Sequence, residues 1–527
     1  MHDNLIYLNN RTTRTSRGQL IAGCVTIILL ALFIFSSTNG DITVQQDDVL
    51  FMSHSAINSW NYFHEARYRA FLTPFYTLIY DMNGQDTWRT HLFYFALLVL
   101  SALLLYAVLV KLLGAAPALL AAIFYLAYIG KYETVTWMSA GAYLVTANVL
   151  FLSVWIALSS RLGPWEKGGL IAAINWLNVL LCEILIVLAP FYPLLYWLHC
   201  RLRRQPIERR AFAATFLPLL AFLFHVSVIY LSTPKDVPLL WQRNGDRVKE
   251  SQVSILLAQL RTIFKSGLNT GMGDGHFVLL RHGIEGFWKY VPHGAYAAIT
   301  ALGVGAGVAF LLWTAPVIRP EKAIMIPLLI TGFYLALFSP LIGFTANALF
   351  VPSRMLTLVG IGLSLLTAAA TSWALASRIT VMRYAIPAVL LAVSGAEAMA
   401  MNSILYEHET SWAYDSYIRT QLLATGIRPR MGDTIFMSLP VPPLMRDYWR
   451  SGFSQFGGGH IQTIMLMDYG MKFYDSEIRP AILYVNENRG LGPPPPAPAA
   501  RPGHQLYCFY VSDNDYRLTR IDCPKAQ

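Results

Sequence analysis

Long apolar runs alternate with short polar connections over roughly the first 400 residues of the chain. About 20 apolar residues in a helix are enough to cross the hydrocarbon core of a bilayer. We predict about eleven membrane spans, some of them short, from the lengths of these runs. They lie at about 20–35, 91–112, 115–129, 141–158, 168–181, 184–199, 211–231, 292–313, 323–342, 355–376 and 381–400. The pattern predicts a mainly α-helical, polytopic membrane protein.

The first apolar run follows Arg11, Arg14 and Arg17, so it suits either a signal peptide or a membrane anchor. It is long for a signal peptide, and the polar residues 36–40 that follow it do not form a small-residue cleavage site. We interpret the run as an uncleaved anchor. The arginines then predict a cytoplasmic N-terminus.

The fifth and sixth spans form one long apolar stretch, which we divide near Cys182 and Glu183 because a carboxylate is costly at mid-membrane. With this division most basic residues fall in the predicted cytoplasmic connections. These are Lys111, Arg161, Lys167, Arg201, Arg203, Arg204, Arg209, Arg210, Arg319, Lys322, Arg378 and Arg383. The positive-inside rule then predicts an extracytoplasmic C-terminus in a plasma membrane or bacterial inner membrane.

Polar segments between and after the spans predict two external loops, 41–89 and 232–291, within a transmembrane domain of residues 1–400. The first loop is rich in aromatic residues, which suits the headgroup layer. The second contains apolar residues at helical spacing from Val253 to Phe264, which predicts an amphipathic helix on the outer leaflet.

The tail, 401–527, is polar enough to fold in water, and we predict a small extracytoplasmic α/β domain there. A helix is expected at Ser403–Thr425, with strands at 434–439, 461–467, 481–485 and 506–511. Cys508 and Cys523 could form a disulfide outside the cell.

Composition supports the membrane interpretation, with 55% hydrophobic and 13% charged residues. The net charge of +10 comes from short basic clusters between apolar runs, which orient helices and do not indicate nucleic-acid binding. The five cysteines are too scattered for a zinc module, and His54, His64 and His91 lack metal-ligand spacing. No divalent metal or other cofactor is indicated.

A set of ionisable residues that includes acids, bases and histidines lies on the predicted external side. They are Asp47, Asp48, His54, His64, Glu65, Arg67, Arg69, Lys131, Glu133, Glu183 and Arg354. A transporter or flippase is expected to place its functional charges near mid-membrane, where Glu397 is the main candidate. A carboxylate can deprotonate an attacking hydroxyl, and arginines can hold a phosphate leaving group. The external set therefore suits group transfer from a lipid-linked phosphate.

Several of these residues occur in an ordered series of short motifs. The series consists of Asp47-Asp48, ARYRAFLTP at 66–74, His91 entering a Leu-rich span, Glu133-x-Val135-x-Trp137, Cys182-Glu183 and VPSR at 351–354. Because its motifs occur in this order, the chain resembles the GT-C class of integral-membrane glycosyltransferases over residues 20–400. The resemblance is strongest to the protein O-mannosyltransferase type and its bacterial relatives. Cys182 departs from the lysine that relatives often have, and the tail resembles neither the repeat array nor the trefoil of some relatives.

The resemblance implies transfer of a sugar from a polyprenyl-phosphate donor to a protein, lipid or glycan acceptor at the extracytoplasmic face, with inversion. Asp48, or else Asp47, would deprotonate the acceptor. Arg354, with Arg67 or Arg69, would hold the donor phosphate. Glu133 would be a helper that positions the acceptor or a loop, and Glu183 would lie on the substrate side of its turn.

Each of these residues also has a structural interpretation. The Asp pair suits an ordinary polar loop, Glu133 and Glu183 suit helix caps, and Arg354 suits an interfacial anchor. A ligase or polymerase of lipid-linked glycans would use outer-face arginines without an Asp pair, and the transporter or flippase hypothesis also stays open.

Overall fold

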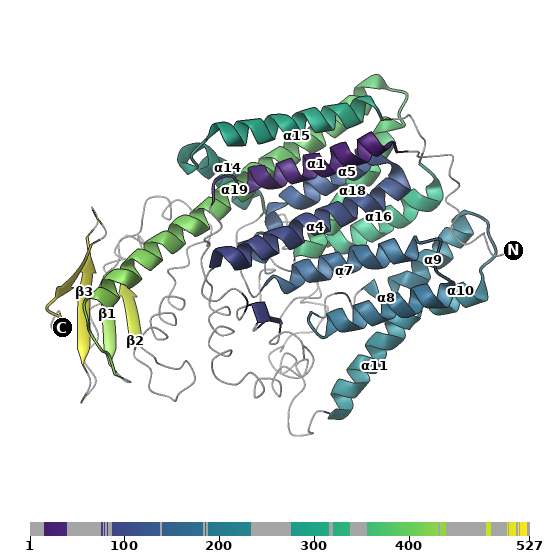
Figure 1. The fold of residues 1–527 in the computed structure, drawn as a ribbon. Helices are drawn as coiled ribbons and strands as arrows, with labels where there is room; N and C mark the ends of the chain where they lie inside the picture. The colour runs from purple at the N-terminus through teal and green to yellow at the C-terminus, as the bar shows by residue number, and fades with distance from the viewer. Residues whose placement is uncertain are drawn as a thin grey trace.

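The structure is a computed structural model that describes residues 15–38, 75–76, 78–79, 82, 87–136, 140–182, 185, 188–232, 276–315, 320–337, 356–430, 433–438, 481–485, 503, 505–512, 515 and 517–523. These residues form an elongated bundle of helices with a small sheet beyond one end (Figure 1). The predicted fold class, mainly helical and polytopic with a small α/β tail, is confirmed.

Each predicted span overlaps a described helix of the bundle, and one further helix, α14, lies in the predicted external loop 232–291. The bundle helices are α1 (Arg17–Ile34), α4 (Thr87–Leu113), α5 (Ala115–Ala127), α7 (Ala142–Ala157), α8 (Pro164–Val179), α9 (Phe191–Leu202), α10 (Arg209–Ala214), α11 (Leu217–Ser232), α14 (His276–Tyr290), α15 (Ala295–Trp313), α16 (Lys322–Leu337), α18 (Leu356–Leu375) and α19 (Thr380–Ala424). Two short elements, η2 (Ile129–Lys131) and α6 (Glu133–Thr136), lie between α5 and α7.

Length and composition make six segments of the described helices capable of crossing a membrane. They are Arg17–Ile34, Trp88–Leu113, Arg209–Val228, Ala295–Trp313, Leu356–Leu375 and Thr380–Thr410. Shorter apolar helices occur at Ala115–Ala127, Ala142–Ala157 and Lys322–Leu337. The chain is therefore a multi-pass membrane protein.

Local sequence sets several helix ends. Ser16 accepts a hydrogen bond from the amide of Gln19 at 3.2 Å, and the Gln19 side chain accepts one from the amide of Ser16, which forms a capping box for α1. Gly114 has φ +88° between α4 and α5, in the left-handed region that favours glycine. The turn allows α5 to fold back directly on α4.

The helix α5 lies at the centre of the bundle, and all of its residues are buried. It packs against α1, α4, α18 and α19. Small residues allow close packing elsewhere: a Cβ atom on Gly362 of α18 would lie 2.7 Å from the carbonyl oxygen of Gly332 on α16. Contact of this kind is a usual basis of helix association in membranes.

The predicted break near residue 182 is present, because α8 ends at Val179 and α9 begins at Phe191. The Asn178 amide donates a hydrogen bond to the carbonyl of Cys182 at 3.1 Å, and its oxygen lies 3.3 Å from Thr146 Oγ1 of α7. These contacts fix the first part of the turn. Within the span predicted at 184–199, the described α-helix α9 begins at Phe191.

The last span and the first helix of the tail were predicted as separate helices, but the structure has one helix, α19, of 45 residues. The predicted domain boundary at residue 400 falls inside it. The sequence prediction ended the span where polar residues begin. The backbone hydrogen bonds of a helix can continue where its side chains change from apolar to polar. No proline, which would interrupt them, follows Pro387 within α19.

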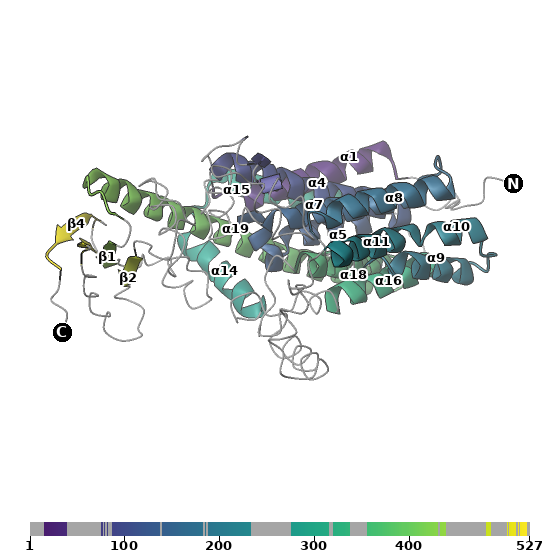
Figure 2. The ribbon, with the colours of Figure 1, turned by 90° about the horizontal axis from the view of Figure 1, so that it is seen from below.

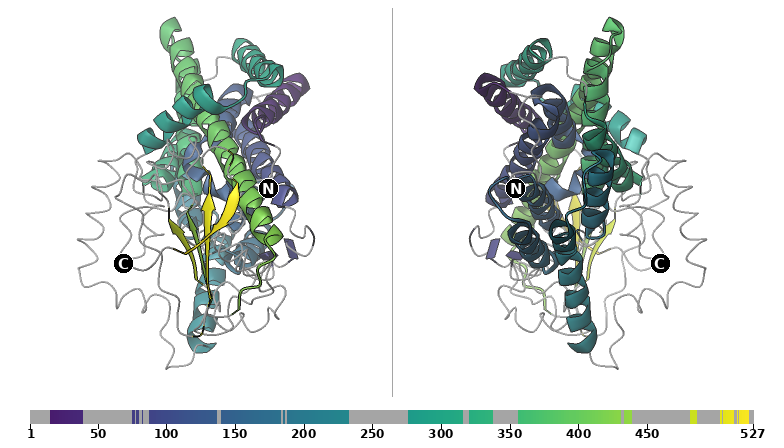
Figure 3. Two further views of the ribbon diagram at one scale, coloured as in Figure 1. Left: turned by 90° about the vertical axis from the view of Figure 1, so that its left-hand side faces the viewer. Right: turned by 90° about the vertical axis from the view of Figure 1, so that its right-hand side faces the viewer.

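The tail forms a sheet of β1 (Thr434–Ser438), β2 (Ala481–Val485), β3 (Leu506–Val511) and β4 (Leu518–Ile521), in the order β2-β1-β3-β4. Only the β3–β4 pair is antiparallel. Ile418 and Leu422 of α19 pack with Ile435 and Phe509, so the end of α19 covers the sheet (Figure 3). A disulfide joins Cys508 to Cys523, as the sequence allowed.

Three of the predicted strands, at 434–439, 481–485 and 506–511, correspond to β1, β2 and β3. The short β4 was not predicted. The strand predicted at 461–467 and the amphipathic helix at 253–264 lie outside the described residues.

Candidate active site at one end of the bundle

The two ends of the bundle differ in chemistry. We call the end opposite the sheet the basic end, where α9 and α10 lie (Figure 1). Arg203 of α9 bonds Glu321 beside α16 at 2.5 Å, and Gln19 of α1 bonds Thr314 after α15 at 3.1 Å. The described basic residues at or next to the helix ends here are Arg17, Lys111, Arg161, Lys167, Arg201, Arg203, Arg204, Arg209, Arg210, Lys322, Arg378 and Arg383. Apart from Arg17, which precedes the first span, they are residues that the sequence placed in cytoplasmic connections; Arg319 of that set lies outside the described residues.

We call the opposite end, from which α19 continues to the sheet, the sheet end. The end of α1, the turn after α5 and the start of α14 all contact α19 there. The Asn402 amide donates to the carbonyl of Phe33 at 2.8 Å and to Ser36 Oγ at 3.2 Å, which ties the end of α1 to α19.

The turn after α5 is built around Lys131, which is fully buried. Its ammonium group donates to the carbonyl of Tyr125 and, at 3.3 Å, to those of Leu126 and Tyr128. A cation at this position satisfies carbonyls at the end of α5 and suits the helix dipole. Burial lowers the pKa of Lys131 to about 7, and the nearby charge of Glu397 opposes this change. Lys131, one of the external ionisable residues noted in the sequence, is thus a helix cap.

Glu397 of α19 is buried beside this turn. One carboxylate oxygen accepts a hydrogen bond from the amide of Ile129 at 2.9 Å, and the other lies 2.7 Å from Nε2 of His276. The imidazole ring of His276 stacks on Tyr128 with 5.3 Å between ring centroids. Glu397 was the main residue that the sequence offered to a transporter, and in the structure its carboxylate bonds the turn and α14.

Glu133 is the first residue of α6 and is buried. Its segment is fixed on two sides, because His91 Nε2 of α4 lies 3.4 Å from the carbonyl of Thr136 and the ring of Tyr132 lies 6.3 Å from that of His408. His91, which the sequence placed at the entry to a Leu-rich span, lies near the start of α4.

Two buried ionisable residues of α19, Glu407 and His408, were missed by the sequence reasoning. Among the described residues, Glu407 Oε2 has no hydrogen-bond partner. The two residues lie in a polar run that looked like part of a solvated tail, so only the packing of α19 reveals their burial.

The other predicted site residues lie outside the described residues. They are Asp47, Asp48, Arg67, Arg69, Glu183 and Arg354. The described helix ends next to them in sequence can be located. Leu356, two residues after Arg354, packs with Phe124 and Tyr128 at the end of α5. Three other segments also lie toward the sheet end. The end of α1 contacts Asn402, and the start of α4 contacts Thr136. Cys182 accepts a hydrogen bond from Asn178.

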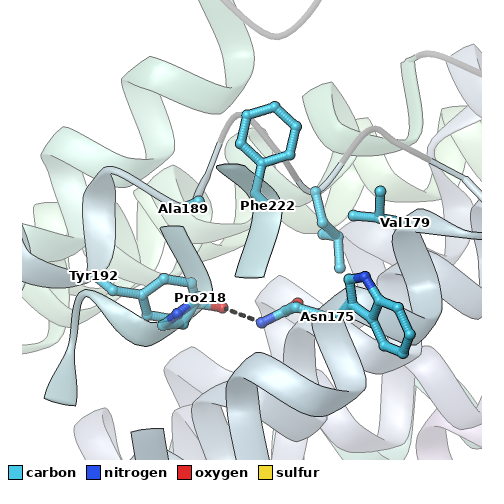
Figure 4. A pocket seen from close by; sticks show the side chains of 8 residues that line it. Asn175, Val179, Ala189, Tyr192, Pro218 and Phe222 are labelled. Carbon is cyan, nitrogen blue, oxygen red and sulfur yellow. Dashed lines mark hydrogen bonds between the residues drawn. The ribbon is translucent and has the colours of Figure 1, made fainter. Parts of the chain in front are cut away.

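No group of three or more His, Cys, Asp or Glu residues that could hold a metal ion occurs in the described part of the chain. A hollow lies between α8, α9 and α11 (Figure 4). The amide of Asn175 donates to Tyr192 Oη at 3.3 Å within it. Its other lining residues are Trp176, Val179, Leu185, Ala189, Pro218 and Phe222, so the described residues that line it carry no carboxylate, ammonium or imidazole group.

No protein-family model and no curated protein matches the chain. The solved structures that are similar to it include two of one protein. Both are of ArnT from Cupriavidus metallidurans, one bound to undecaprenyl phosphate (14% identity, covering 81% of this chain and 84% of that one) and one in the apo state (16% identity, 81% and 83%). The TM-score is 0.36 in each case. ArnT is a GT-C glycosyltransferase, the class that the order of motifs resembles. At this level of similarity the match carries no argument about the activity of this chain.

Proposed function

We propose that the protein is a membrane glycosyltransferase that moves a sugar from a polyprenyl-phosphate donor to an acceptor at the extracytoplasmic face. One observation carries the proposal: the described helix ends that flank the predicted site residues in the sequence lie toward the sheet end, where Glu133 is held. Residues far apart in sequence can therefore serve one site.

The charge distribution supports the orientation in this proposal. Basic residues gather at the other end of the bundle, which the positive-inside rule places in the cytoplasm. The sheet end and the disulfide-linked sheet then face the extracytoplasmic side, where disulfides persist. The sheet is in place to receive or orient the acceptor.

In the proposed reaction, the acceptor oxygen attacks the anomeric carbon of the donor sugar. The bond between that carbon and the phosphate oxygen breaks, and polyprenyl phosphate leaves. Asp48, or Asp47, takes the proton of the acceptor hydroxyl. Arg354, with Arg67 or Arg69, holds the phosphate and stabilises its charge. Glu133 and Glu183 position the substrates.

The decisive experiment is transfer of labelled sugar from a panel of polyprenyl-phosphate sugars by the purified full-length protein, using membrane and envelope extracts as acceptors. Removal of a general base should lower the rate about 10²- to 10⁴-fold, so we expect this loss in Asp48→Asn or in Asp47→Asn. Asp81→Asn, in the same predicted loop, is the matched control and should keep the wild-type rate. Undiminished transfer in both variants of the pair removes the pair from the mechanism, and no transfer by the wild type rejects the proposed function.

A further inference from the structure

The helix α19 contributes to the sheet end through a carboxylate that the proposed mechanism does not use. We propose that Glu397 is a positioning residue, which holds the segment 129–136 and the start of α14 in one fixed arrangement and thereby sets the position of Glu133. The inference rests on the proposed function, which makes Glu133 part of the site.

The two oxygens of the Glu397 carboxylate have partners from two different segments. Oε2 accepts from the amide of Ile129, and Oε1 bonds His276, the first residue of α14. Glu397 therefore joins three segments that are far apart in sequence.

The connection from Ile129 to Glu133 is short and regular. The amide of Tyr132 donates to the carbonyl of Ile129 at 2.9 Å, and the amide of Val135 donates to that of Tyr132 at 3.0 Å. Because these bonds leave no extended linker, a shift of Ile129 is passed on to Glu133.

The helix α14 is fixed to α19 at a second point. A Cβ atom on Gly283 would lie 2.5 Å from Cβ of Ala400, so the two helices approach closely there. Figure 2 shows α14 beside α19 near the sheet end. With the bond from His276 to Glu397, this contact resists sliding of α14 along α19.

The energetics favour a positional role over a stabilising one. A carboxylate is costly within a membrane protein, and replacing a buried ion pair by apolar residues often leaves a protein equally stable. Glu397 has an exposed fraction of only 2% and still makes two directed bonds. Such bonds specify geometry in a way that apolar packing does not.

Two substitutions separate position from charge. Glu397→Gln keeps the length of the side chain and an acceptor oxygen for Ile129 but removes the charge. Glu397→Asp keeps the charge but withdraws the carboxylate by about 1.5 Å, the length of one carbon–carbon bond. Ser394→Ala is the matched control, because Ser394 is buried on the same helix and its hydroxyl donates to the carbonyl of Leu390 within α19.

The activity test is the kcat of sugar transfer, normalised to folded protein. A small misplacement in an active site can cost about 100-fold in rate, so we expect kcat of Glu397→Asp to fall at least about 10-fold, with a smaller fall for Glu397→Gln and KM little changed in both. A merely structural role would lower the folded fraction and leave the normalised kcat unchanged. The reverse order, with Glu397→Gln the more impaired, overturns the positioning role.

Hydrogen exchange gives a readout independent of activity. Peptides covering 128–136 should exchange faster in Glu397→Asp than in the wild type, while Glu397→Gln and Ser394→Ala stay close to the wild type. Unchanged exchange in Glu397→Asp overturns the inference even where transfer is observed. Absence of transfer by the wild type instead rejects the proposed function, and the exchange result still tests whether Glu397 holds the segment.

Discussion

The two ends of the bundle use carboxylates in different ways. At the basic end, Arg203 and Glu321 form an ion pair whose side chains are 14% and 41% exposed. At the sheet end, the His276 and Glu397 side chains are only 11% and 2% exposed. Exposed charges orient a membrane protein while constraining its geometry little, whereas buried ones must be matched by specific partners. The sheet end is therefore the part of the bundle where polar residues dictate structure.

The largest expected effect at the sheet end follows loss of Lys131. Lys131→Met removes the cap of α5 and leaves Glu397 without its neighbouring positive charge. A buried carbonyl left without its hydrogen-bond donor costs about 1–3 kcal/mol, so a clear fall in the thermal midpoint of the detergent-solubilised protein is expected. The double variant Lys131→Met with Glu397→Gln should recover part of the loss. A midpoint equal to wild type in Lys131→Met would contradict the capping role.

The same residue predicts a pH dependence. The pKa of Lys131 is about 7 in the folded protein, below its ordinary value, so between pH 7 and about 10 the unfolded chain binds more protons than the folded one. The free energy of unfolding contributed by this group therefore rises with pH across that window and is constant below it. Thermal midpoints measured at intervals from pH 7 to 10 should increase more in the wild type than in Lys131→Met. Parallel curves would refute the assignment.

A smaller effect is expected at the attachment of α1 to α19. Asn402→Ala removes hydrogen bonds to Phe33 and Ser36. The carbonyl of Phe33 also accepts hydrogen bonds from Ser36, so it keeps a partner in the variant. The free energy of unfolding should therefore fall by only about 1 kcal/mol. The thermal midpoints of Asn402→Ala and Ser394→Ala, measured side by side, give this loss of stability. Equal midpoints for the two variants would show that this attachment adds no stability.

The smallest effect belongs to the basic end. Arg203→Gln breaks the pair with Glu321, and a partly exposed pair of this kind contributes at most about 1 kcal/mol. The change in thermal midpoint should be small and should shrink further at high salt, because ions screen exposed charges. A loss as large as that of Lys131→Met would mean that the contrast between the two ends is wrong.

The spans were predictable because a membrane imposes a length and a composition on each helix. The split near Cys182 was predictable as well, since it follows from the cost of Glu183 in the bilayer and from charge alternation. The continuity of α19 and the short β4 were not predictable. The change to polar residues near residue 400 hides the first, because the backbone hydrogen bonds of a helix continue through such a change, and the second depends on pairing with β3.

The sequence by itself determined the class of the protein, the approximate positions of its spans and the division of charge between its ends. These follow from local composition, which the bilayer selects directly. Only the tertiary structure decided that Lys131 caps α5, that Glu397 joins the turn after α5 to α14, and that Glu407 and His408 are buried on α19. Burial and partners depend on contacts between residues far apart in the chain, and no local pattern of residues contains them.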